Sequence, residues 1–208
     1  MAKNADLPAV LRLPTCHPRP KSELMQAAKV RAAERGETLK DLVTRAVHAG
    51  VCTAANQWQG EARQVRRPVI LLDAGVWLAA AWGRHIHHPV AAEWLDGQED
   101  DLGLCRVTQM SLLRLLSNPA VMHEDVVSRG DAWQVIDQIR ADQRVLWAEE
   151  PAQLEAVWRA LSARDEISHK LWTDDYLAAF SQAAGATLAT LDRKLRHRYP
   201  SIHVDTLT

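Results

Sequence analysis

The C-terminal two thirds of the chain alternates short apolar runs with segments in which apolar residues recur every three to four positions. The runs predict five strands, at 69–73, 103–107, 144–148, 186–192 and 202–207. Helices are expected between them, at about 76–82, 89–95, 108–117, 131–141, 151–161 and 169–184. Alternation of this kind is typical of an α/β fold, with a mostly parallel sheet covered by helices on both faces.

The first strand is followed at once by an acidic residue. Its residues Val69–Leu72 are continuously apolar, which is typical of a strand buried on both faces at the centre of a parallel sheet. Asp73 would then lie at the carboxyl end of this strand, where ligands gather in open α/β sheets. A second interpretation stays open, because an Asp in this place is also a common N-cap of the next helix.

Two further aspartates fall near the same predicted edge of the sheet. Asp192 follows the fourth strand, and Asp174 lies in the first turn of the helix before that strand. Each also has a local interpretation, Asp192 as a turn residue and Asp174 as an acid favoured by the helix dipole. Converging carboxylates repel one another unless a divalent cation neutralises them, and oxygen ligands alone suit Mg²⁺ or Mn²⁺. Such a cation suits phosphodiester hydrolysis without a side-chain nucleophile, and Cys105, expected inside the second strand, offers none.

The first 67 residues have a different pattern. Residues 9–14 (AVLRLP) alternate like a strand, a helix is expected from Ser22 to about Arg35, and a second, amphipathic helix from about Leu39 to Gly50. The polar stretch 51–67 is expected to be a linker. One strand and two short helices bury too little surface to be stable alone, so this segment is expected to pair with a partner.

The motif LRLP followed by LMQAAKVRAAERGETLKDLVTRAVHAG, at residues 11–50, resembles the ribbon-helix-helix fold of VapB-type antitoxins. The resemblance implies a head at residues 1–50 that dimerises through its strand and enters the major groove of operator DNA. Arg12 would then point towards the bases.

Four motifs in residues 68–208 resemble, in order, the PIN domain of VapC-type toxin ribonucleases: LLDAGVWLAA, TQMSLLRLLSNPAV, LWTDDYLAAFSQAAGATLATLD and IHVDTL. The resemblance implies an Mg²⁺-dependent endoribonuclease of a toxin–antitoxin system, with RNA as substrate and an antitoxin as partner. Asp73, Asp174 and Asp192 would be its metal-binding carboxylates. Gln109 stands where many relatives have Glu and completes the expected catalytic set, and Gly75 stands where the family commonly has Asn or Ser.

Several basic residues near these motifs are candidate RNA contacts. Arg193 and Arg196 follow Asp192, and Arg114 lies on the helix that carries Gln109. For each, a solvated helix surface is an equally open interpretation.

Charge divides the chain at the same boundary as the motifs. Residues 1–67 carry 12 Lys+Arg against 6 Asp+Glu, whereas residues 68–208 carry 13 against 20. A basic head on an acidic body predicts two modules with different partners. Three widely spaced cysteines and the lack of a long apolar run favour a cytoplasmic protein without a membrane span.

The leading hypothesis is therefore a homodimeric, metal-dependent ribonuclease with an antitoxin-like head. The alternative is a non-catalytic, degenerate PIN protein that acts as a DNA-binding or interaction regulator, and Gly75 and Gln109 favour it. A phosphatase on a related sheet is disfavoured, because Gly75 occupies the position where such enzymes carry a second Asp.

Overall fold

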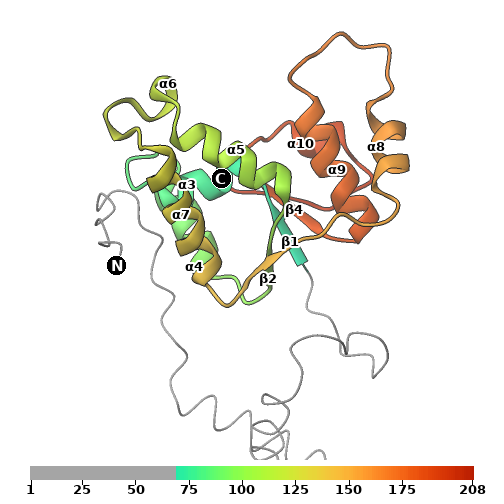
Figure 1. Ribbon diagram of the computed structural model, residues 1–208. Coiled ribbons are helices and arrows are strands. Elements are labelled where there is room, and N and C mark those ends of the chain that lie inside the picture. Colours follow the sequence, from blue (N-terminus) through green and yellow to red (C-terminus); the bar gives the residue numbers. More distant parts are fainter. Residues whose placement is uncertain (1–68) are drawn as a thin grey trace, which may run out of the picture. The chain divides into compact units, whose positions relative to one another are not determined.

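The computed structural model describes residues 69–208, which form a five-stranded, wholly parallel sheet (Figure 1). The strand order is β3-β2-β1-β4-β5. The strands are β1 (Val69–Leu72), β2 (Asp101–Leu104), β3 (Val145–Trp147), β4 (Thr187–Thr190) and β5 (Val204–Thr206). The predicted α/β class with a parallel sheet is confirmed. The predicted head at 1–50, the linker at 51–67 and Arg12 lie outside the described residues.

Helices connect the strands. They are α3 (Ala74–Ala81), α4 (His88–Asp96), α5 (Arg106–Leu116), α6 (Pro119–Met122), α7 (Arg129–Ala141), α8 (Leu154–Ser162), α9 (Trp172–Ala184) and α10 (Leu195–Arg198), with a 3₁₀ turn η1 (His123–Asp125). None of those between residues 69 and 208 is long and apolar enough to cross a bilayer.

The central strand β1 contributes to two hydrophobic cores, one on each face of the sheet. Ile70 and Leu72 pack into a core with α3, α4, α5 and α7, whereas Leu71 packs into the other core with α8, α9 and α10. Figure 1 shows these two groups of helices on opposite sides of the strands. Because successive side chains of a strand point to opposite faces, a continuously apolar run is what this central position requires.

The second strand differs from its prediction. It covers Asp101–Leu104 rather than residues 103–107, and Cys105 is the N-cap of α5 rather than a strand residue. Thr108 lies in the first turn of α5, where its Oγ1 accepts from the Cys105 N–H at 3.2 Å. The hydroxyl also donates to the Cys105 carbonyl at 3.0 Å. This reciprocal cap turns the chain out of the sheet directly after Leu104.

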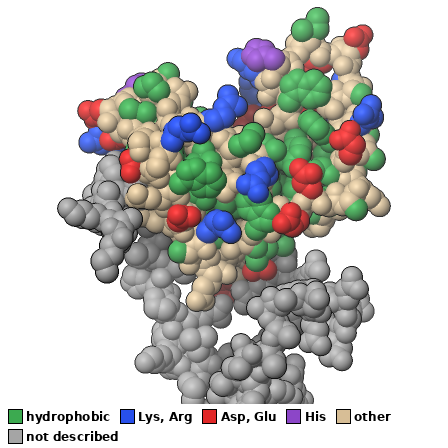
Figure 2. Space-filling view, viewed as in Figure 1, with side chains coloured by type: hydrophobic (Ala, Val, Ile, Leu, Met, Phe, Trp, Pro, Cys, Tyr) green, Lys and Arg blue, Asp and Glu red, His purple; other side chains and the backbone are tan. Residues whose placement is uncertain are grey.

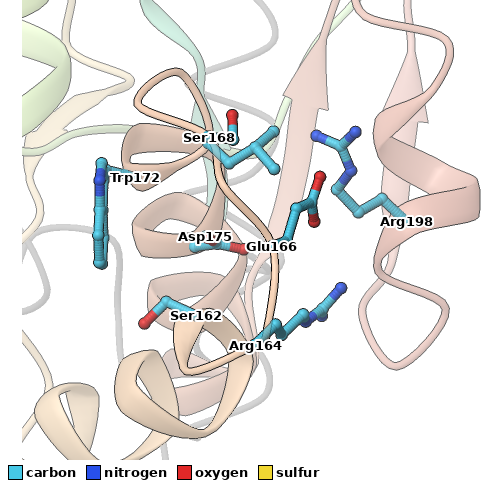
Figure 3. Close-up of a pocket in the computed structure, with 8 residues that line it drawn as sticks. Ser162, Arg164, Glu166, Ser168, Trp172, Asp175 and Arg198 are labelled. Atoms are coloured by element: carbon cyan, nitrogen blue, oxygen red, sulfur yellow. The ribbon is translucent and has the colours of Figure 1, made fainter.

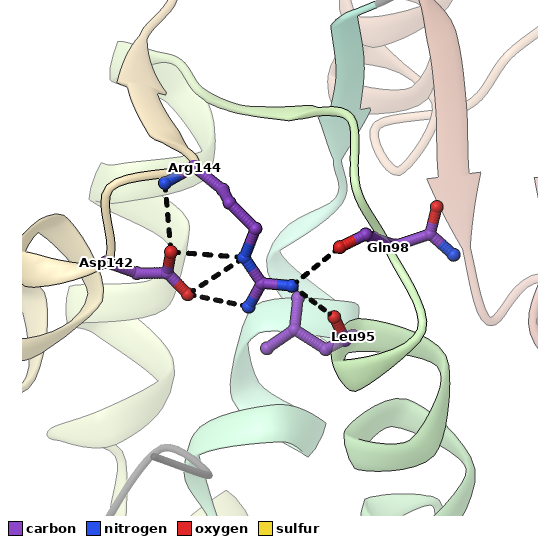
Figure 4. A network of polar contacts seen from close by, with 4 residues as sticks. All are labelled: Leu95, Gln98, Asp142 and Arg144. Atoms are coloured by element: carbon purple, nitrogen blue, oxygen red, sulfur yellow. Dashed lines mark hydrogen bonds and ion pairs between the residues drawn. The ribbon is translucent and has the colours of Figure 1, made fainter. Parts of the chain in front are cut away.

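An arginine ties the loop after α4 to the start of β3 (Figure 4). Arg144 donates from Nη1 to the carbonyls of Leu95, at 2.7 Å, and Gln98, at 2.9 Å, and from Nη2 to Asp142 at 2.7 Å. Burial raises the pKa of Asp142, but its hydrogen bonds and charge interaction with Arg144 outweigh burial, so the pKa of Asp142 is lowered. The network fixes the edge of the sheet that is distant from β4.

Candidate active site

Asp73 is held at the carboxyl end of β1 by the neighbouring strand. Its N–H donates to the Ala189 carbonyl of β4 at 3.0 Å, and its Oδ2 accepts from Thr190 Oγ1 at 3.2 Å. It occupies the N-cap position of α3, yet its side chain makes no capping hydrogen bond, so capping does not explain this carboxylate. Burial raises its pKa, and the charge of Asp192 adds to that rise, while Thr190 and the first N–H groups of α3 oppose it.

Thr190 links two of the three predicted aspartates. It is fully buried, and besides donating to Asp73 its Oγ1 accepts from the Asp192 N–H at 3.1 Å. Asp192 itself is exposed, and its Oδ1 accepts from the Lys194 N–H at 2.9 Å, which is the turn interaction expected of it locally. Thr190 was missed in the sequence analysis. Its only sequence signal is its position at the end of the strand TLAT, two residues before Asp192.

Asp174 lies in the first turn of α9, within electrostatic reach of the other two. Its pKa is raised to about 6, first by burial and then by the charges of Asp73 and Asp192. Arg198 of α10 opposes the rise, with its Nη1 3.8 Å from Asp174 Oδ2. The charges of Asp73 and Asp192, carried by two other parts of the chain, therefore disfavour the ionised form of Asp174.

This donor set fits a hard divalent cation in its chemistry, since all three groups are carboxylates that disfavour one another's charge. Within residues 69–208, however, no three His, Cys, Asp or Glu side chains are gathered closely enough to form a ligand set as they stand. The three carboxylates are coupled but not drawn together. Mg²⁺ keeps several waters and needs few direct protein ligands, which is compatible with such a loose arrangement.

The acidic residue next to Asp174 has a structural role. Asp175 is buried and accepts from the Tyr199 hydroxyl at 2.6 Å, which joins α9 to the end of α10. Burial and this hydrogen bond raise the pKa of Tyr199 well above its usual value. Asp175 therefore positions the helix that carries Asp174, and its carboxylate is engaged by the Tyr199 hydroxyl.

Gln109 is buried on α5 and is engaged by an arginine. Its Oε1 accepts from Arg106 Nη1 at 2.7 Å, and the Arg106 guanidinium lies over the Trp147 ring, 4.4 Å from its centroid. The structure thus gives the Gln109 amide a cationic neighbour. At Gly75, an added Cβ would meet only Asp73 Oδ2, at 3.8 Å, so there is room for the side chain that the position lacks.

The remaining basic candidates are exposed. Arg114 lies in the last turn of α5, while Arg193 and Arg196 lie after β4 and in α10. Figure 2 shows a notch between the α6 and α10 sides of the molecule, with Lys and Arg side chains around it. Their exposure leaves these arginines accessible to a polyanion such as RNA, but exposure alone does not show that they bind one.

Residues 70–199 match the model of the PIN domain. The chain belongs to this family. The PIN domain is similar to ribonuclease VapC41 of Mycobacterium tuberculosis, 38% identical over 130 residues, which are 60% of this chain and 89% of the relative. It is also similar to ribonuclease VapC29 of the same organism, 30% identical over 136 residues, which are 65% of this chain and 94% of the relative.

A solved structure agrees with the fold of the PIN domain. M. tuberculosis VapC20, described as a sarcin-ricin loop cleaving toxin, superposes with a TM-score of 0.50 at 16% identity, covering 64% of this chain and 95% of VapC20. At that identity the likeness shows the fold alone. The predicted PIN domain with VapC ribonuclease relatives is confirmed, and the family match falls within the predicted domain at 68–208.

Proposed function

We propose that the protein is an Mg²⁺- or Mn²⁺-dependent endoribonuclease, the toxin of a VapBC-like pair, acting in the cytoplasm. The observation that carries this proposal is the mutual repulsion of Asp73, Asp174 and Asp192 at the carboxyl edge of the sheet. Its VapC relatives, which are named ribonucleases, support RNA as the substrate. The same resemblance supports an antitoxin as a partner.

The three aspartates would hold the cation, which supplies an activated water and stabilises charge on a phosphate when bound. Thr190 orients Asp73 by its hydrogen bond and fixes the Asp192 backbone by another, so that both carboxylates face the same edge. Arg198 lowers the repulsion at Asp174. Arg114, Arg193 and Arg196 would attract RNA phosphates, and Gln109 would support the site by hydrogen bonding alone.

The N-terminal 67 residues would add an antitoxin-like head to this nuclease. In the proposal, residues 1–50 dimerise and bind operator DNA through Arg12, residues 51–67 link them to the PIN domain, and the whole protein is a homodimer. The basic charge of this segment supports nucleic acid as its partner.

The test is RNA cleavage by the full chain with Mg²⁺, compared with Asp73→Asn and with Asp137→Asn, an exposed aspartate of α7. We expect Asp73→Asn to lower the cleavage rate at least about a hundredfold and Asp137→Asn to leave it unchanged. Equal rates in all three proteins would remove the site.

A non-catalytic regulator is the second candidate, and Gln109 favours it, since a neutral amide that accepts from Arg106 stands where many relatives have Glu. Calorimetric titration with Mn²⁺ distinguishes the two. Absence of binding heat, together with retention of operator DNA, would support the regulator against the nuclease.

A further inference from the structure

An exposed tryptophan stands two residues before Asp174. Trp172, the first residue of α9, is 55% exposed, and its ring meets Trp158 of α8 edge-on, with centroids 6.2 Å apart. Between the two helices lies a hollow of about 250 Å³, lined by Glu155, Trp158, Arg159, Ser162, Ala163 and Trp172. An indole face left open to water beside a hollow is a surface on which a flat ring can stack.

A second hollow shares part of its lining with the first (Figure 3). Trp172 and Ser162 line both hollows, and the second is also lined by Arg164, Glu166, Ser168 and Arg198. Arg198 is the residue that pairs with Asp174 at 3.8 Å. An aromatic surface is thus continuous with two arginines, one of which contacts the proposed metal-binding group.

The charges around the second hollow leave both arginines accessible. Arg164 is exposed, and its guanidinium lies over the Tyr199 ring, 5.8 Å from the centroid. Asp175, which also lines the hollow, is taken by the Tyr199 hydroxyl, and Glu166 is exposed. Arg198 is about one third exposed while it pairs with Asp174.

We propose that Trp172 stacks a base of the RNA strand next to the cleaved bond, while Arg164 and Arg198 contact the phosphates of that strand. The inference rests on the proposed function and deepens it by naming a substrate subsite. Stacking on an aromatic face is tolerant of base identity, so the subsite holds the strand without selecting one base. Arg198 lines the second hollow and pairs with Asp174, so a phosphate held by Arg198 would lie near the carboxylate edge.

The test measures binding of a fluorescein-labelled, single-stranded adenosine RNA by anisotropy, in the full chain carrying Asp73→Asn so that the RNA stays intact. The matched control for Trp172→Ala is Trp133→Ala, because Trp133 is 47% exposed on α7, against the other face of the sheet. We expect Trp172→Ala to raise Kd about tenfold, Trp172→Phe to restore most of the affinity, and Trp133→Ala to leave it unchanged. Thermal unfolding of each variant reports whether the fold is kept.

The outcomes separate the subsite from the function. If the parent protein binds and the native chain cleaves RNA, but Trp172→Ala binds like Trp133→Ala, the subsite is refuted and the nuclease stands. If the native chain neither binds nor cleaves RNA, the function fails and the subsite with it. If Trp172→Ala leaves RNA affinity unchanged and instead alters the sedimentation coefficient, the surface is a protein contact and the inference is overturned.

Discussion

Replacing Asp174 by Asn should stabilise the metal-free protein at neutral pH. The pKa of this carboxyl group is raised from 3.8 to about 6, so the folded state favours its protonated form. Stability from that preference is fully present below about pH 4 and is lost as pH rises through about 6. Asn cannot ionise, so Asp174→Asn would retain at high pH the stability that the wild type loses when Asp174 ionises.

The size of the effect follows from the shift and its surroundings. Two pKa units correspond to about 3 kcal/mol as an upper limit. Because the Asp174 side chain is 30% exposed, solvent screening lowers this, and we expect a gain of about 1–2 kcal/mol at pH 8 and about none at pH 4.

Urea unfolding of the full chain in EDTA, followed by tryptophan fluorescence, measures this difference at both pH values. Asp137→Asn serves as the control and should show no such pH dependence. Adding Mn²⁺ should reverse the order, since a ligand at a hundred times its Kd stabilises the wild type by about 2.7 kcal/mol, whereas Asp174→Asn binds weakly. A loss of stability in Asp174→Asn that is the same at pH 4 and pH 8 would refute the idea of repelling carboxylates.

Three further substitutions test the supporting structure. Thr190→Val removes both hydrogen bonds of the buried hydroxyl. It should lower the free energy of urea unfolding by about 1–3 kcal/mol and the rate of RNA cleavage about tenfold. An unchanged cleavage rate would show that Thr190 does not orient the site. Gly75→Ser fits beside Asp73 and should raise the unfolding free energy by about 0.5 kcal/mol through helix propensity, with tighter Mn²⁺ binding by calorimetry; a fall in stability would show that the space is not there. Arg144→Met should cost about 2 kcal/mol because it leaves the Leu95 and Gln98 carbonyls without this donor and removes the ion pair of Asp142. Mn²⁺ affinity should stay as in wild type, and a changed affinity would mean that this edge of the sheet influences the site.

The sheet and the aspartates were predictable because they depend on pattern and topology. A continuously apolar run such as Val69–Leu72 has few stable places other than the centre of a parallel sheet, and a residue directly after it must lie at the carboxyl edge. The electrostatic coupling of Asp174 to Asp73 and Asp192 agrees with that prediction. Their role as metal ligands stays a prediction.

Other features depend on contacts between distant segments and left no local signal. β2 begins at Asp101, a poor strand former, because the backbone there pairs with Val69 of β1. Thr190 reaches Asp73 across 117 positions of sequence, and only the adjacency of β4 and β1 makes that hydrogen bond. The exposure of Trp172 and Trp133 was likewise not evident from the sequence, because a Trp in a helical pattern is usually buried. In the structure Trp133 is 47% exposed.

The strand order has a consequence for synthesis. Asp73 and Thr190 become neighbours only when β4 takes its place beside β1. A ribosome translating this protein would therefore carry an incomplete carboxylate edge until Thr190, 117 positions after Asp73, has been added to the chain. A nascent chain that has not yet reached β4 would therefore hold Asp73 without its hydrogen bond from Thr190.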